Sequence, residues 1–160
     1  MIRLGTVTGL PVVLSGRMMG RVEQTVLTPD GHTLRGLVVR HGLGGAKWVD
    51  SGCIRVLGDV SVIISDKPGH LPKDADFTLT SVKDTGGLNL GRVTDVYLNP
   101  HSFQVTALEI TLGLMEEWTC GRMLARDFVV RPAPQEPGQV LIPCGCTLEK
   151  TNRDRREVEV

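Results

Sequence analysis

The sequence feature that most constrains the fold is an internal repeat. Residues 16–22 align without a gap on residues 87–93, so that Gly16 falls on Gly87 and every later pair keeps the same offset. Glycines and aliphatic residues recur together over a fixed period, which indicates that one supersecondary unit occurs twice. The positions that mark the repeat are Gly16, Gly20 and Val22 in the first copy and Gly87, Gly91 and Val93 in the second. The same offset also superposes Leu27 on Leu98, Pro29 on Pro100, Leu37 on Leu108, Val39 on Ile110 and Gly42 on Gly113.

Each copy has the pattern of a β-meander. A strand from residue 20 to 27 leads into the turn 28–31, where proline presets φ and glycine supplies the flexible corner. Residues 34–39 return as the next strand, and residues 99–102 form the equivalent corner in the second copy. The apolar positions of the strand that ends at Leu98 are out of phase, which predicts a β-bulge near Asp95.

The second half of each copy aligns less closely. We expect Trp48 to correspond to a position near Trp118, and residues 60–64 to correspond to residues 127–130. A Pro/Gly-rich breaker at 132–138 precedes a further strand at 139–143, and residues 65–74 form the connection between the copies. The predicted boundaries are 1–70 for the first domain, 71–147 for the second and 148–160 for a charged tail.

The alternation of side chains predicts which residues form the core. On the returning strands, Leu37 and Val39 share one face, as do Leu108 and Ile110. The opposite face carries Val38 in the first copy and Glu109 in the second, so we expect it to face outward. The full predicted core is Val22, Leu37, Val39, Val62 and Ile64, with Val93, Leu108, Ile110 and Val129.

An aliphatic residue on an outward face predicts a covered surface. Together with Met18 and Met19, Val38 suggests that this side of the first copy is covered by the second copy, by the strand 139–143 or by another subunit. The alternative is a slipped register that places Val38 in the core and Leu37 outside. Arg21 and Arg92 occupy equivalent positions and are either part of an interface with an anionic partner or solvated charges on an edge strand.

These motifs resemble the PRC-barrel family. The Gly-x-x-x-Gly-Arg-Val opening, the aliphatic strand, the Asn/Asp/Pro/Gly corner and the aliphatic return strand are similar to that small β-barrel, found in the photosynthetic reaction-centre H subunit and at the C-terminus of a ribosome maturation factor. The resemblance implies an all-β fold of two tandem small PRC-barrel-like β-barrels. It also implies a binding or assembly module and provides no catalytic residues to transfer.

Charge and cysteine content narrow the remaining functions. The chain has 18 basic and 18 acidic residues, so it lacks the basic footprint that would support direct nucleic-acid binding. No apolar run suggests a signal peptide or a membrane span, which favours a cytoplasmic protein with reduced thiols. Cys144 and Cys146, with Cys120, are weak candidates for a metal site, because their spacing is C-x-C and buried cysteines usually act as small apolar residues.

The sequence therefore predicts a non-enzymatic adaptor that needs no cofactor and whose two modules bind a protein partner. Self-association is left open beside a separate partner, and an accessory role in RNA processing or ribosome maturation is the alternative. The glycine-rich segment 41–47 lacks the Gly-Lys-Ser/Thr ending of a phosphate-binding loop and is predicted to be a hairpin loop.

Overall fold

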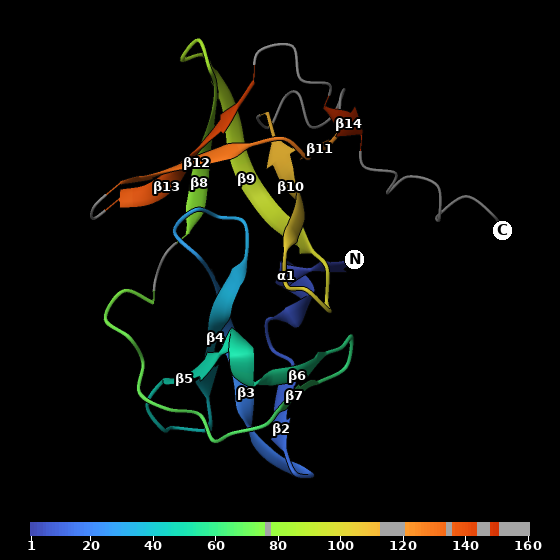
Figure 1. Cartoon of the computed structure of the whole chain (residues 1–160), viewed down its shortest axis with the longest axis vertical. Coiled ribbons are helices and arrows are strands. Elements are labelled where there is room, and N and C mark those ends of the chain that lie inside the picture. Colours follow the sequence, from blue (N-terminus) through green and yellow to red (C-terminus); the bar gives the residue numbers. More distant parts are fainter. Residues whose placement is uncertain (76–77, 113–120, 134–135, 144–147, 151–160) are drawn as a thin grey trace, which may run out of the picture.

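A computed structural model describes residues 1–75, 78–112, 121–133, 136–143 and 148–150. Over these residues the chain is all-β apart from two short helical turns, α1 (Leu4–Val7) and η1 (Ser51–Cys53). Figure 1 shows two sheets stacked along the long axis of the molecule, with the strands from the first half of the chain below those from the second half. We call the lower half unit one and the upper half unit two.

Valine, isoleucine and leucine dominate the strands, as expected for a sequence with few aromatic residues. The strands of unit one are β2 (Pro11–Leu14), β3 (Arg17–Leu27), β4 (Leu34–Arg40), β5 (Lys47–Asp50), β6 (Ile54–Leu57) and β7 (Val62–Ile64). The strands of unit two are β8 (Leu79–Asp84), β9 (Asn89–Leu98), β10 (Val105–Thr111), β11 (Met123–Ala125), β12 (Val129–Ala133), β13 (Glu136–Ile142) and β14 (Glu149–Lys150). The remaining strand, β1 (Ile2–Arg3), pairs with β9 of unit two.

The two sheets have the same strand order. Unit one runs β5-β4-β3-β2-β7-β6, and unit two runs β11-β10-β9-β8-β13-β12, with β14 added beside β11. The β2–β7 and β8–β13 pairs are parallel, whereas the other ladders of these two series are antiparallel. Each sheet is open, because no ladder joins its two end strands within the described residues. The closed barrels implied by the family resemblance are therefore not seen.

The long hairpins repeat in register as well as in order. Val22 pairs with Val39, and Val93 pairs with Ile110, so the equivalent residues of the two copies form equivalent pairs. The bulge expected near Asp95 is present, and the same irregularity occurs after Val22. The alignment of the hairpins was thus readable from the sequence.

The backbone explains why both copies have glycine at the equivalent positions 20 and 91. Gly20 has φ +139° and Gly91 has φ +132°, a region that residues with a Cβ rarely adopt. A Cβ on Gly20 would lie 2.6 Å from the Arg40 carbonyl oxygen, and one on Gly91 would collide with the Thr111 carbonyl oxygen. Each glycine therefore lets its strand approach the neighbouring strand closely.

The second halves of the units correspond differently from the sequence expectation. The parallel partner of β8 is β13, so β13 is the counterpart of β7, and β12 is the counterpart of β6. Residues 127–130 are therefore not the equivalent of residues 60–64. Across the β4 and β10 ladders, Leu124 takes the place of Trp48. Trp118 lies outside the described residues.

The core prediction holds at most positions. One apolar cluster runs through both units, and Leu37, Val39, Leu108 and Ile110 are fully buried within it. Val22, Val62 and Ile64 are buried as well, whereas Val93 is only half-buried against this cluster. Val129 was wrongly assigned, because its side chain is 59% exposed and the buried neighbours are Phe128 and Val130.

Candidate functional site

The units contact each other through the tips of their long hairpins. From unit one, the backbone N–H of Leu34 donates to the Phe103 carbonyl (2.9 Å), and the His32 carbonyl accepts from the N–H of Val105 (2.8 Å). The tip also packs on unit two: the His32 ring stacks on Phe128 with centroids 4.7 Å apart. Gly31 lies so close to the Val130 side chain that a Cβ on this glycine would collide with it. This contact is closely packed.

Local hydrogen bonds fix the shape of each tip. In unit one, the Asp30 carboxylate accepts from the Thr28 hydroxyl and from the His32 N–H, and these bonds lower the pKa of Asp30. In unit two, the Asn99 side-chain oxygen accepts from the N–H groups of His101 (2.9 Å) and Ser102 (3.3 Å). Asp and Asn act here as turn residues that satisfy their own backbone.

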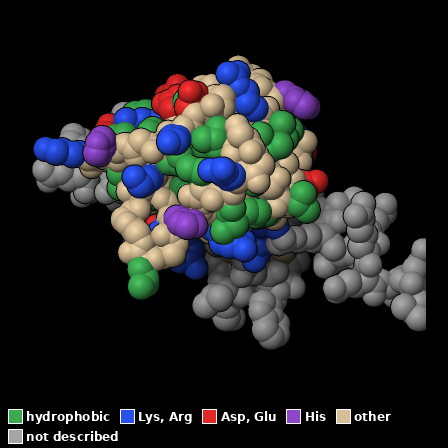
Figure 2. Space-filling view, turned by 90° about the horizontal axis from the view of Figure 1, so that it is seen from below, with side chains coloured by type: hydrophobic (Ala, Val, Ile, Leu, Met, Phe, Trp, Pro, Cys, Tyr) green, Lys and Arg blue, Asp and Glu red, His purple; other side chains and the backbone are tan. Residues whose placement is uncertain are grey.

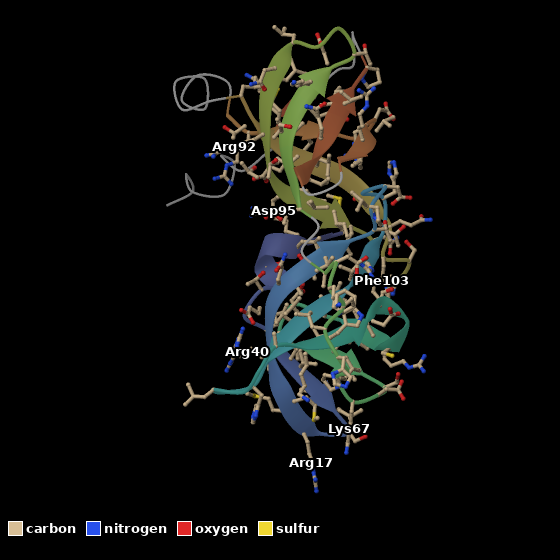
Figure 3. All side chains as sticks on the ribbon, turned by 90° about the vertical axis from the view of Figure 1, so that its left-hand side faces the viewer. Arg17, Arg40, Lys67, Arg92, Asp95 and Phe103 are labelled. Carbon is tan, nitrogen blue, oxygen red and sulfur yellow. The ribbon has the colours of Figure 1, made fainter. Side chains whose placement is uncertain are left out.

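The contact of the unit-one tip with β12 is closed, and the repeat predicts an equivalent contact between the unit-two tip and β6. The offset that places Gly20 on Gly91 also places His32 on Phe103. Val56 pairs with Ile63 as Val129 pairs with Leu141, so β6 is the counterpart of β12 and Val56 is the counterpart of Val129. The tip of unit two therefore faces β6 as the tip of unit one faces β12. Figure 3 shows Phe103 at the level where the two units meet.

This second contact leaves a hollow of about 260 Å³, which we call the β6 hollow. It lies between the edge strand β6 and the tip of the unit-two hairpin. Phe103 is held at its wall with φ +59°, an unusual conformation for a bulky residue, by the backbone bonds to Leu34 and Asn99. The residues that line the hollow are Ile54, Arg55, Val56, Leu57, Pro100, His101 and Phe103.

The open side of β6 is apolar and basic. Val56 is 48% exposed, and Ile63, its partner on β7, is 41% exposed. Arg55 is exposed and makes no ion pair within 4.0 Å with any residue that the structure describes. Its charge still acts on Asp66, whose pKa is lowered chiefly by hydrogen bonds from Ser65 and Cys53 and to a smaller degree by Arg55. An unpaired strand edge beside a partly apolar hollow is a surface suited to a protein partner.

A buried ionic cluster lies on the outer face of unit two. Glu109 was expected to face water, but its side chain is completely buried. Its carboxylate accepts hydrogen bonds from Arg122 (2.8 Å), the Tyr97 hydroxyl (3.0 Å) and the Thr94 hydroxyl (3.3 Å). Burial and this acidic neighbour raise the pKa of Tyr97. The expectation failed because strand alternation cannot report a segment that arrives from elsewhere in the chain.

The segment that covers Glu109 is the N-terminal arm. β1 pairs Ile2 with Leu98 and Arg3 with Tyr97. The Arg3 guanidinium lies 2.7 Å from the Asp95 carboxylate and 3.6 Å from that of Glu109. The Gly5 N–H also donates to Asp95, which Figure 3 shows beside α1. The cluster therefore anchors the arm of unit one onto unit two.

Val38 is the counterpart of Glu109 in unit one, and it lies beside a segment that leads into unit two. Val38 is buried, and it lines a hollow together with Leu71, Pro72, Lys73 and Ala75 from the connection between the units. The strand at 139–142, one of the covers predicted for Val38, pairs with β8 and β12 instead. The slipped register is excluded, because Leu37 is fully buried.

The other interface candidates are not brought together with Val38 on one surface. Met18 is 48% exposed, while Met19 is half-buried against the core. Figure 2 shows that hydrophobic and Lys or Arg side chains adjoin on the lower end of unit one, where Figure 3 places Arg17 and Lys67. Arg21 donates to the Gly9 carbonyl (2.9 Å), and Arg92 is exposed on the other sheet. The two arginines therefore form no common site.

The structure does not describe the cysteines that were predicted as weak candidates for a metal site. Cys120, Cys144 and Cys146 all lie in ranges that the structure does not describe. Cys53 is half-buried, and burial, with a hydrogen bond to Asp66, raises its pKa. Within the described ranges, no group of three His, Cys, Asp or Glu side chains could hold a metal ion.

Comparison with known proteins adds no assignment. No model of a known protein family matches this chain, and no curated protein matches it. In the described part of the chain, no helix is both long and apolar enough to cross a membrane.

Proposed function

We propose that the protein is a non-enzymatic cytoplasmic adaptor built from two PRC-barrel-like modules, and that it binds a protein partner at the β6 hollow. The observation that carries the proposal is an asymmetry between two equivalent contacts. The hairpin tip of unit one packs closely on Phe128 and Val130, whereas the tip of unit two leaves a hollow against β6. A duplicated fold that closes one contact and leaves the other open has room for an additional element at the open contact.

The surface around the hollow has the composition of a protein-binding site. Phe103, Pro100 and Val56 provide apolar contact area, and Arg55 and His101 provide polar contacts at its wall. Interfaces favour aromatic residues and arginine at the residues that contribute most to binding. The buried cluster around Glu109, in contrast, uses its described contacts to hold the protein's own N-terminal arm.

A matched pair of variants tests this function. Val56→Asp places a charge beside the hollow, and Val129→Asp makes the same change at the equivalent position of unit two, which is also exposed. We expect a specific partner to be retained by the wild type and by Val129→Asp, and reduced about tenfold or more by Val56→Asp, since tenfold corresponds to about 1.4 kcal/mol. The measurement is quantitative mass spectrometry of proteins captured from a lysate of the source cells.

Two outcomes would change the assignment. Equal capture by all three proteins would show that the partner does not bind at the β6 hollow. Recovery of ribosomal proteins and RNA, sensitive to Val56→Asp, would favour an accessory role in RNA processing or ribosome maturation over a general adaptor.

A further inference from the structure

We infer that the element bound at the β6 hollow is an extended segment of the partner that adds to β6 as a further strand and carries alternating apolar and acidic side chains. This inference rests on the proposed function and specifies the chemistry of the partner. It is carried by the backbone of β6, by the charges at the hollow and by the apolar residues beside it.

The backbone supports strand addition because β6 differs from the other edge strands of the two sheets. β5 has a bridge between Trp48 and Gly69 on its outer side, and β14, the end strand beside β11, has only two residues. Against β12, the hairpin tip of unit one packs on Val130. Among the described residues, β6 pairs only with β7 and faces the hollow on its other side. Free N–H and C=O groups on an edge strand are a template for an incoming strand.

The charges favour acidic side chains on the incoming strand. Arg55 and His101 line the hollow, and no carboxylate is among its lining residues. Arg55 also lacks an ion-pair partner within the described part of the chain. A guanidinium can form two parallel hydrogen bonds with a carboxylate, so an acidic residue on the partner would satisfy it.

The apolar residues account for the alternation. Val56 and Ile63 are paired across β6 and β7 and form a partly exposed strip, and Phe103 with Pro100 forms the facing wall. Successive side chains of a strand point to opposite faces. An added strand would therefore place its apolar side chains on this strip. We assign its acidic side chains, on the opposite face, to the neighbourhood of Arg55 and His101.

The test uses a synthetic peptide, blocked at both ends, in which valine and glutamate alternate. We expect the full chain to bind it in isothermal titration calorimetry. N-methylation of alternate peptide nitrogens should abolish binding, because it removes the donors that a strand contributes to a ladder. Arg55→Glu should weaken binding about tenfold, whereas Arg17→Glu, at the lower end of unit one (Figure 3), should leave it unchanged.

A charge swap makes the result specific. A peptide with lysine in place of glutamate should bind Arg55→Glu better than it binds the wild type. If neither peptide bound, or if N-methylation made no difference, the strand-addition inference would be overturned. The proposed function would still stand if Val56→Asp reduced capture of a cellular partner. If peptide binding appeared only after residues 151–160 were removed, the occupant would be the chain's own C-terminal segment, and a separate partner strand would be ruled out.

Discussion

Replacing Glu109 with Ala is expected to lower the free energy of unfolding by about 3 kcal/mol, the upper end of the range for removing a buried hydrogen-bonding partner. The carboxylate is completely buried and accepts hydrogen bonds from Arg122, Tyr97 and Thr94. The substitution takes this acceptor from all three groups and leaves Arg3 with the Asp95 carboxylate. The measurement is urea unfolding followed by circular dichroism.

The matched control is an ion pair at the surface of unit one. Glu23 lies 2.8 Å from Arg40, and both side chains are almost half-exposed. Solvent screens such a pair, so Glu23→Ala should change the free energy of unfolding far less than Glu109→Ala does. Equal effects of Glu23→Ala and Glu109→Ala would show that the cluster around Glu109 does not anchor the N-terminal arm.

Replacing Gly91 with Ala is expected to lower the free energy of unfolding by about 3 kcal/mol, the upper end of the range for a strained backbone position. The new Cβ would collide with the Thr111 carbonyl oxygen, and φ of +132° is itself unfavourable for alanine. The strand pair β9–β10 would have to separate locally to accommodate it. The same urea unfolding experiment measures the loss.

Gly87 provides the comparison for Gly91→Ala. It also has a positive φ, of +91°, but a Cβ there would meet no atom within 4 Å. Gly87→Ala should therefore lower the free energy of unfolding by only about 1–2 kcal/mol, because the unfavourable backbone conformation is its only cost. A Gly91→Ala variant as stable as Gly87→Ala would contradict the close approach of β9 and β10.

The sequence was most informative where the structure depends on neighbours along the chain. The constant offset between the copies predicted the register of the β3–β4 and β9–β10 hairpins, because turn residues and strand alternation are local properties. The break in the alternation of apolar residues near Asp95 likewise predicted the β-bulge. Beyond the β10 strand, insertions differ between the units, and for this reason residues 127–130 were matched to the wrong strand.

The candidate site depends on contacts that no local pattern reports. Glu109 is buried because Arg3, from the other end of the chain, covers it. The β6 hollow exists because Phe103 meets β6 across the junction of the units. One signal was present in the sequence: Phe103, an aromatic residue, stands at a hairpin tip where the other copy has His32. Without the arrangement of the units, this difference could not be assigned to a site.

We propose that this protein binds its partner at the open contact beside β6. NMR chemical-shift mapping of the ¹⁵N-labelled chain, titrated with the alternating valine–glutamate peptide, tests it most directly. We predict that the amide signals of Arg55, Val56 and Phe103 shift on binding, while those of Val129 and Val130, at the closed counterpart, stay unchanged. Shifts confined to β12, or to the cluster around Glu109, would contradict the claim.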